Sequence, residues 1–255
     1  MIKDKLKYAS FVDFVKKFKK ASDIIRMEKP EYIIAPILGA VPFIDILSII
    51  DKHFPLESVH YLPNSSRFAN RDELTLKWYS NFYKKNEINE PMKIICLDEV
   101  LSGSSAVNGY KQFKRSIEER TKEKAKGVSN ELEARKYYRQ KLNKNISYRS
   151  IGFAEKDYRR NPVFSNLVNK KKVYVLEFDE IPTIDNMALN PVHLKPLKKH
   201  ENGKITYLPE IESFEVTPEY MNFLQNIATY IGVDPKTVSP INFSRIEEGL
   251  KQAKE

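Results

Sequence analysis

Short apolar runs alternate with segments of helical spacing along most of this chain, and this alternation constrains the fold more than any other feature. The runs lie at residues 31–40, 58–63, 92–100, 146–156 and 171–181. Parallel strands need a crossover of a dozen or more residues between them, and a helix usually supplies it. The pattern therefore predicts an α/β fold with a mostly parallel sheet flanked by helices.

Start signals mark the expected helices. Phenylalanines recur at helical spacing near the start of the chain, where Ser10 and Asp13 resemble a capping box. Pro42 lies in the first turn of the next expected helix, where its missing N–H costs no hydrogen bond. Residues 64–90 are polar and weakly patterned, so we expect a long loop there, with one short helix at about 74–82.

The chain is expected to form one α/β domain with a small extension. The α/β domain spans residues 1–199 and contains a charged helical insertion at about 115–143. After it the pattern changes, because Thr217-Pro218 begins a helix and a second short helix follows. We therefore predict a C-terminal helical extension over residues 200–255.

Composition places the chain among globular proteins, since 41% of its 255 residues are hydrophobic and 30% are charged. No apolar run is long enough to span a membrane, and the lysine-rich start lacks a cleavage site. We therefore expect a soluble cytoplasmic protein with no membrane partner. The single cysteine, Cys96, excludes a disulfide framework within the chain, and the four histidines lack metal-ligand spacing.

Positive charge is concentrated in one stretch. The chain carries 43 Lys and Arg against 34 Asp and Glu, and residues 114–144 contain eleven of the former and five of the latter. A basic surface attracts phosphorylated metabolites, nucleic acid or acidic lipid headgroups. The alternative is a solvated helical face held by pairs of opposite charge.

The stretch "IICLDEVLSGSSA", residues 94–106, has the features of a sugar-phosphate site. A strand passes into a helix at small residues, and the first turn of a helix has unpaired N–H groups that bind phosphate. Gly103 allows the backbone to approach an anion, and the neighbouring serine hydroxyls can donate further hydrogen bonds. A plain turn followed by a serine N-cap is the alternative.

Asp98 and Glu99 give the same stretch a second function. Ionised carboxylates accept hydrogen bonds from vicinal hydroxyls, and they are also suitable ligands for Mg²⁺, which commonly accompanies polyphosphates. A diol together with a phosphate indicates ribose 5-phosphate. The sequence lacks the glycine patterns of P-loop and dinucleotide-binding proteins, and "GSSAV" lacks the second glycine of a nucleophile elbow.

Residues 94–105 resemble the phosphoribosyl pyrophosphate (PRPP) signature of type I phosphoribosyltransferases: four apolar residues, two acids, two variable positions and Ser-Gly-Ser-Ser. The resemblance implies that Asp98 and Glu99 are catalytic, contact the ribose hydroxyls and hold Mg²⁺. It also implies that the 5-phosphate is bound by the loop that contains Ser102, Gly103, Ser104, Ser105 and Ala106.

Three weaker likenesses follow in the order expected of that family, and they are loosely closest to its 6-oxopurine branch. "PILGAVPF" resembles the first loop, in which the backbone of Leu38 and Gly39 would contact pyrophosphate. "SSRFANRDE" falls where the mobile loop begins, so Arg67 is a candidate catalytic residue that closes over pyrophosphate. "VYVLEFDEIP" resembles the strand over the base, so Glu177 and Asp179 are candidate base-binding residues.

Each of these assignments has a plainer alternative that the sequence leaves open. In these alternatives Gly39 only ends a strand, Arg67 is solvated, and Glu177 and Asp179 only terminate their own strand. The resemblance covers about residues 10–190, and the charged insertion and the C-terminal extension depart from the smaller members of the family.

The resemblance implies a cytoplasmic, homodimeric, Mg²⁺-dependent enzyme of nucleotide metabolism. It would transfer phosphoribosyl from PRPP to a nitrogenous base with release of pyrophosphate. The departures keep two alternatives open, a PRPP- or nucleotide-sensing regulator and a defence or toxin-type effector. Either would use the same pocket and bind nucleic acid or a protein partner through residues 114–144.

Overall fold

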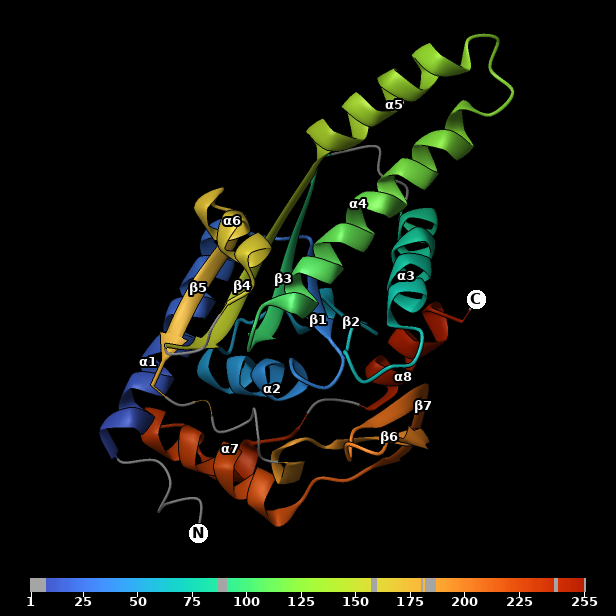
Figure 1. The fold of residues 1–255 in the computed structure, drawn as a ribbon. Coiled ribbons are helices and arrows are strands. Elements are labelled where there is room, and N and C mark those ends of the chain that lie inside the picture. Colours follow the sequence, from blue (N-terminus) through green and yellow to red (C-terminus); the bar gives the residue numbers. More distant parts are fainter. Residues whose placement is uncertain are drawn as a thin grey trace.

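The computed structural model describes residues 8–86, 91–156, 160–179, 181, 187–240 and 243–254. Five parallel strands form the central sheet in the order β2-β1-β3-β4-β5 (Figure 1). These are β1 (Tyr32–Pro36), β2 (Val59–Leu62), β3 (Met92–Val100), β4 (Ile146–Glu155) and β5 (Val173–Phe178). The sheet confirms the predicted α/β class, and each strand matches one of the five apolar runs.

Eight α-helices are described: α1 (Tyr8–Glu28), α2 (Val41–Ile50), α3 (Arg71–Lys85), α4 (Ser104–Ala125), α5 (Glu131–Asn145), α6 (Pro162–Asn169), α7 (Pro218–Ile231) and α8 (Phe243–Gln252). Short 3₁₀ turns lie at Leu56–Ser58, Met187–Leu189 and Pro235–Thr237. Pro42 lies in the first turn of α2, as predicted. None of the described helices is both long and apolar enough to cross a membrane.

Two large hydrophobic clusters cover the two faces of the sheet. On one face α1 and α2 pack against the strands, and Phe18 of α1 stacks on Phe153 of β4 with ring centroids 4.6 Å apart. On the other face α3 and α4 pack against Ile94 and Cys96 of β3. Because both faces are covered, the strands read as nearly continuous apolar runs.

The short helix expected at about 74–82 is present as α3, and it is longer than predicted, so less of the described 64–86 segment is loop. α3 has fifteen residues and buries Trp78, Tyr79, Phe82 and Tyr83 against the sheet. These aromatics recur at i, i+1, i+4 and i+5, which is a helical period that lysines and asparagines partly conceal in the sequence. The capping box expected at Ser10 is also wrong, because α1 already begins at Tyr8.

The C-terminal part contains an antiparallel hairpin that the sequence did not reveal. It consists of β6 (Val192–Lys199) and β7 (Ile205–Phe214), so it extends across residue 200, where the extension was expected to begin. The two predicted helices follow it. α7 begins after Thr217, whose hydroxyl accepts a hydrogen bond from the Tyr220 amide over 3.1 Å, and α8 comes next.

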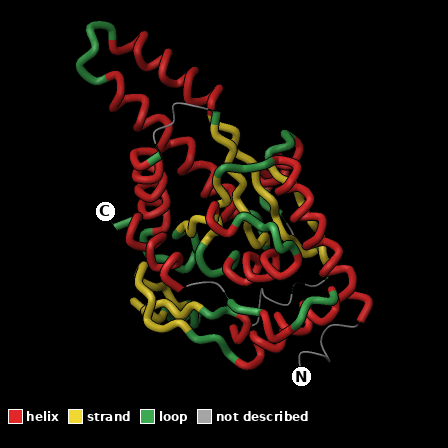
Figure 2. Tube along the Cα trace, turned by 180° about the vertical axis from the view of Figure 1, so that it is seen from behind, coloured by secondary structure: helices red, strands yellow, loops and turns green. Residues whose placement is uncertain are grey.

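Both C-terminal helices share the core of the sheet. Phe223 of α7 and Ile246 of α8 belong to the same hydrophobic cluster as α1 and α2. Tyr220 of α7 donates a buried hydrogen bond to Asp45 of α2. Figure 2 shows α7 and the β6–β7 hairpin at the end of the molecule opposite the α4–α5 hairpin.

Gly249 tests how closely α8 is docked. A Cβ atom at this position would overlap the backbone oxygen of Tyr61 and lie 2.9 Å from the Tyr61 Cβ. Gly249→Ala should therefore lower the free energy of unfolding by about 1–3 kcal/mol, although alanine is the better helix former. Urea unfolding measures the difference.

Glu248→Ala is the matched control on the same helix. Its side chain is 65% exposed and forms only a surface ion pair with Lys85, so it should change stability by less than about 1 kcal/mol. Equal stabilities of Gly249→Ala and wild type would contradict the docking of α8 on β2.

Candidate functional site

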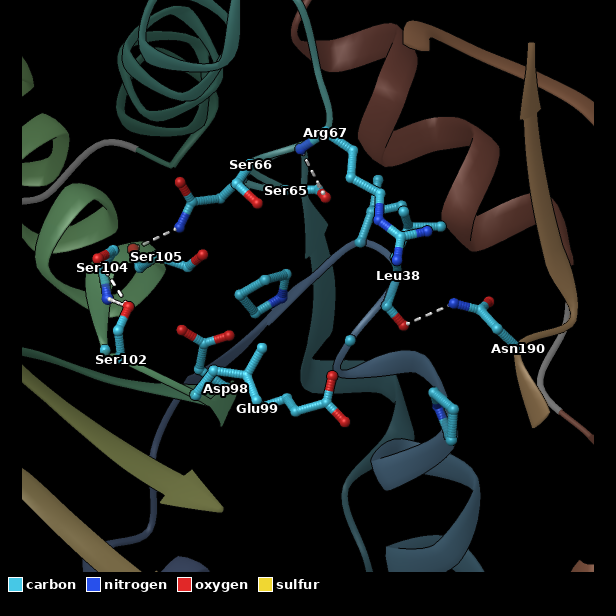
Figure 3. Close-up of a pocket in the computed structure, with 17 residues that line it drawn as sticks. Leu38, Ser65, Ser66, Arg67, Asp98, Glu99, Ser102, Ser104, Ser105 and Asn190 are labelled. Carbon is cyan, nitrogen blue, oxygen red and sulfur yellow. Dashed lines mark hydrogen bonds between the residues drawn. The ribbon is translucent and has the colours of Figure 1, made fainter. Parts of the chain in front are cut away.

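A cavity of about 220 Å³ opens at the carboxyl ends of β1 and β3 (Figure 3). In the order β2-β1-β3, the chain leaves β1 and β3 in opposite directions, so a crevice forms between the loops that follow them. The loop after β2 and the side chain of Asn190 complete its walls. This is the position at which open α/β sheets bind their ligands.

The structure brings most of the predicted site residues together. Nine line this cavity: Leu38, Gly39, Arg67, Asp98, Glu99, Ser102, Gly103, Ser104 and Ser105. Asp98 and Glu99 lie at the end of β3 itself, and the others come from the segments that follow β1, β2 and β3.

Three predicted residues do not line it. Ala106 is buried in a small apolar cluster with Val100 and Phe164. Glu177 forms an ion pair with Arg160, and Asp179, whose side chain is 61% exposed, pairs with Lys156 over 2.6 Å. Both acids lie at the end of β5, the edge strand two places from β3. They were expected at the site because the order of the strands in the sheet could not be predicted from the sequence. Glu180, the acid that follows Asp179, lies outside the described residues.

Asp98 and Glu99 reach the cavity from opposite faces of the sheet. Side chains alternate along a strand, so Asp98 follows Cys96 towards the α3–α4 face, while Glu99 follows Leu97 towards the α1–α2 face. In Figure 3 the two carboxyl groups point in opposite directions across the floor of the cavity. A Cβ atom on Gly39 would lie 3.1 Å from Glu99 Oε2, so a larger residue there would require Glu99 to move by a few tenths of an ångström.

Asp98 is the most perturbed acid of the site. It is 4% exposed, and its Oδ2 atom makes no hydrogen bond within the described residues. Burial, and to a smaller extent the neighbouring charge of Glu99, raises the pKa of Asp98 to about 8. An unsatisfied buried oxygen beside a second acid is unfavourable by itself, so the site is suited to a cation or a hydroxyl donor.

The acids fit Mg²⁺ in chemistry and number. Mg²⁺ is usually held by one or two carboxylates, with phosphate oxygens and water completing its shell. Across the described ranges, no three His, Cys, Asp or Glu side chains come together to form a complete protein site. Because the two carboxyl groups point in opposite directions, one of them would hold the ion together with water and the oxygens of a ligand.

The serine loop is held in a conformation that requires glycine. Gly103 has φ +79°, and a Cβ atom there would overlap the ring of Phe164. The loop is fixed by a 2.7 Å hydrogen bond from the Asn161 amide to the Ser102 carbonyl. Because α4 begins at Ser104, its first-turn N–H groups lie at the cavity, where they suit an anion.

The first loop holds a strained residue. Leu38 has φ +84°, a conformation that non-glycine residues seldom adopt. Its carbonyl accepts a hydrogen bond of 3.4 Å from Asn190 Nδ2, a contact between residues 152 positions apart. Backbone strain of this kind persists only where its surroundings impose it, and it is common at ligand sites.

Asn64 is a site residue that sequence reasoning missed. Its Nδ2 atom donates to the Ser105 carbonyl over 2.8 Å, and its Oδ1 atom accepts from Asn108 Nδ2 over 3.0 Å. Asn108 in turn accepts a hydrogen bond from Gln112, so a buried polar network joins the loop after β2 to the first turns of α4. In the sequence, the signal for Asn64 was its position directly after the apolar run at residues 58–63. The sequence shows no such signal for Asn190.

The loop that contains Arg67 is attached to the C-terminal hairpin. The Arg67 carbonyl accepts a 2.9 Å hydrogen bond from the Tyr207 amide, and the Ala69 amide donates to the Tyr207 carbonyl over 3.2 Å. The segment likened to a mobile loop is thus paired with β7 in this structure. Figure 3 shows the Arg67 side chain extending from this loop towards Leu38.

Comparisons with protein-family models, with curated proteins and with solved structures found no match to this chain. The resemblance to phosphoribosyltransferases therefore depends on the motif and on the chemistry of the residues around the cavity.

The pH dependence of stability tests the buried state of Asp98. Its folded-state pKa of about 8 lies above the ordinary value of 3.8, so the folded protein binds the extra proton between these values. Stability therefore falls as the pH rises through this range, by up to about 1.4 kcal/mol per pH unit for one group. Asp98→Asn should remove this part of the slope, measured by urea unfolding between pH 5 and 8.

Asp179→Asn is the control, because the Lys156 ion pair lowers the pKa of the Asp179 carboxyl and so moves its titration below this range. Identical slopes for wild type and Asp98→Asn would show that Asp98 ionises normally.

Proposed function

We propose that this protein binds PRPP with Mg²⁺ and transfers its phosphoribosyl group to a nitrogen nucleophile, releasing pyrophosphate. One observation carries the proposal. Two parts of the PRPP-like motif line the same cavity, between the loops that follow β1 and β3. They are a helix start suited to an anion and a buried acid with an unsatisfied oxygen.

Each part of PRPP has a suitable group in the cavity. The Ser102–Ser105 loop would bind the 5-phosphate through backbone amides and hydroxyls. Asp98 and Glu99 would accept hydrogen bonds from the ribose hydroxyls. The Leu38-Gly39 backbone and Arg67 would contact the pyrophosphate, whose negative charge grows during the reaction.

The reaction needs positioning and electrostatics rather than a covalent intermediate. The bond from the ribose C1 carbon to the pyrophosphate oxygen breaks with its electron pair on that oxygen. The nitrogen lone pair forms the new bond to C1, and the nitrogen releases a proton to solvent. Bound Mg²⁺ would offset charge on pyrophosphate, while the two acids favour the positive charge on the ribose.

Binding of PRPP with Mg²⁺ tests the proposal. At a hundredfold excess over Kd, the ligand should raise the free energy of unfolding by about 2.7 kcal/mol. Asp98→Asn and Glu99→Gln should abolish most of this gain. The wild-type affinity should increase between pH 6 and 8, because a cation or a ribose hydroxyl favours the ionised form of Asp98, whose pKa is about 8 in the free protein.

Thermal and urea unfolding with and without PRPP and MgCl₂ measure these effects. Asp179→Asn should bind as wild type does, since this acid lies outside the cavity. Unaltered binding in Asp98→Asn and Glu99→Gln, or no binding by wild type, would contradict the proposal.

The projecting α4–α5 hairpin supports a second candidate function, that of a regulator or effector that binds nucleic acid. The hairpin extends away from the sheet (Figure 1) and carries most of the 114–144 segment, with its eleven basic and five acidic residues. On α5 only Leu142 is buried, while Leu132 and Tyr137 are 66% and 61% exposed.

Ion pairs leave much of this charge uncompensated. Three pairs hold basic residues of the hairpin: Arg120–Glu123, Arg135–Glu131 and Arg139–Glu118. The expected solvated face is therefore present, but lysines such as Lys136 and Lys141 remain in excess. A basic surface with an exposed tyrosine suits phosphates and an unstacked base.

Fluorescence anisotropy with labelled single-stranded RNA and duplex DNA across a salt series tests this second function. The double variant Lys136→Gln/Lys141→Gln should weaken binding and reduce the salt slope by about one to two. Lys198→Gln/Lys199→Gln on β6 should leave it unchanged. Absence of salt-dependent binding by wild type would exclude a nucleic-acid partner for this hairpin.

A further inference from the structure

The C-terminal part of the chain contributes Asn190 to the wall of the cavity. Among the described residues that line it, Asn190 is the only one that follows Ser105 in the sequence. It lies two residues before β6, at the limit of the segment that resembles phosphoribosyltransferases. The motifs on which the proposed function depends therefore assign no role to it.

The backbone that carries Asn190 is firmly held. Leu189 and Val192, on either side of it, are buried in the hydrophobic cluster that covers one face of the sheet. The Ala188 carbonyl accepts a 2.6 Å hydrogen bond from the hydroxyl of Thr217, at the start of α7. Asn190 thus projects into the cavity from a segment that is fixed to the core and to α7.

Two hydrogen bonds fix the side chain of Asn190. Its Oδ1 atom accepts from the Val192 amide over 3.0 Å, and its Nδ2 atom donates to the Leu38 carbonyl over 3.4 Å. If Oδ1 and Nδ2 were exchanged, Nδ2 would face a second N–H donor and Oδ1 would face a second carbonyl oxygen. The amide therefore has one orientation, in which its donor reaches the first loop.

The first loop offers two backbone amides to the cavity. The N–H groups of Leu38 and Gly39 make no hydrogen bond within the described part of the chain, and both residues line the cavity. Successive N–H groups in a turn form a concavity that binds anions. In a trans peptide the carbonyl and the next N–H point in opposite directions. Because the Leu38 carbonyl points to Asn190, the Gly39 N–H points away from it, towards the side on which Figure 3 shows Asp98.

This orientation needs support, because a positive φ is unfavourable for a residue with a Cβ atom. The Val41 amide donates to the Leu38 carbonyl over 3.4 Å, but this bond lies within the same turn. Asn190 adds a bond from outside the turn, anchored at the start of β6. A return of Leu38 to negative φ would rotate the peptide and redirect the Gly39 N–H.

We propose that Asn190 is a positioning residue, whose side-chain amide holds Leu38 at positive φ so that the amides of Leu38 and Gly39 face the pyrophosphate. This inference rests on the proposed function. Asn190 would act through the backbone of the first loop and would need no contact with the ligand. The C-terminal part of the chain would then complete the site, which gives this departure from the smaller members of the family a function.

Isothermal titration with inorganic pyrophosphate in MgCl₂ tests the role of Asn190. Asn190→Ala should weaken pyrophosphate binding about tenfold, because binding then has to impose the positive φ of Leu38. The affinity for ribose 5-phosphate should be unchanged, since this ligand would occupy the serine loop and the acids. Asn202→Ala is the matched control: Asn202 also accepts from the amide two residues further on, but it lies outside the cavity.

Leu38→Gly tests the cause of the effect. Glycine adopts a positive φ freely, so in the presence of this substitution Asn190→Ala should weaken pyrophosphate binding by less than about threefold. Asn190→Asp is a second variant that keeps the acceptor for the Val192 amide but has no donor for Leu38. Its added charge acts with and without Leu38→Gly, so a double-mutant cycle isolates the loss of the Asn190–Leu38 hydrogen bond.

The outcomes separate the two proposals. Wild-type pyrophosphate affinity in Asn190→Ala, or an equal loss with and without Leu38→Gly, would overturn the positioning role alone. A parallel loss of ribose 5-phosphate binding in Asn190→Ala and Asn190→Asp would also overturn it, since Asn190 would then support the fold as a whole. Failure of the wild type to bind PRPP with Mg²⁺ would overturn the proposed function itself.

Discussion

The burial of a carboxyl group at the end of the central strand is the constraint on which the site depends. Asp98 is enclosed because β3 lies between two helical layers, and the same pleat that sends it to one face sends Glu99 to the other. A charge in such a position is unfavourable without a partner. Within the described residues, Asp98 Oδ2 has no hydrogen-bond partner. The cavity thus contains a buried carboxyl group with one unsatisfied oxygen, and a ligand would supply its partner.

Other residues around the cavity have backbone conformations that suit the site but lower the stability of the free protein. Leu38 is held at a positive φ, and Gly103 occupies a position where no side chain fits. The two aromatic-rich cores offset these costs: Phe18 stacks on Phe153 on one face, and Trp78 stacks on Phe82 on the other. Lys29 and Lys171 also have positive φ, but they follow the ends of α1 and α6, where this conformation is common. Leu38 follows a strand instead, so its strain at the cavity is of the kind found at ligand sites.

The features that could be predicted from the sequence are those encoded by short, continuous stretches of residues. The five strands are continuous apolar runs, and the serine loop is a single short motif, so both could be recognised without knowledge of the fold. The β6–β7 hairpin was missed because its strands are rich in lysine and proline and bury little beyond Val192 and Leu194. The roles of Asn64 and Asn190 depend on partners 41 and 152 positions away, which no local pattern encodes. Strand order, which separates Glu177 from the cavity, is likewise a property of the whole sheet.

The two additions to the α/β domain are connected to the site in different ways. The hairpin β6–β7 joins it through backbone hydrogen bonds to the loop of Arg67. The basic hairpin joins it through α4 itself, whose first turn forms the serine loop and whose last turns lead to α5. A helix of 22 residues is about 33 Å long, so the serine loop and the base of the projecting hairpin belong to one rigid element. A partner on the hairpin would influence the cavity by shifting α4 as a body, and the hydrogen bonds that join Asn64 to the Ser105 carbonyl and to Asn108 resist such a shift.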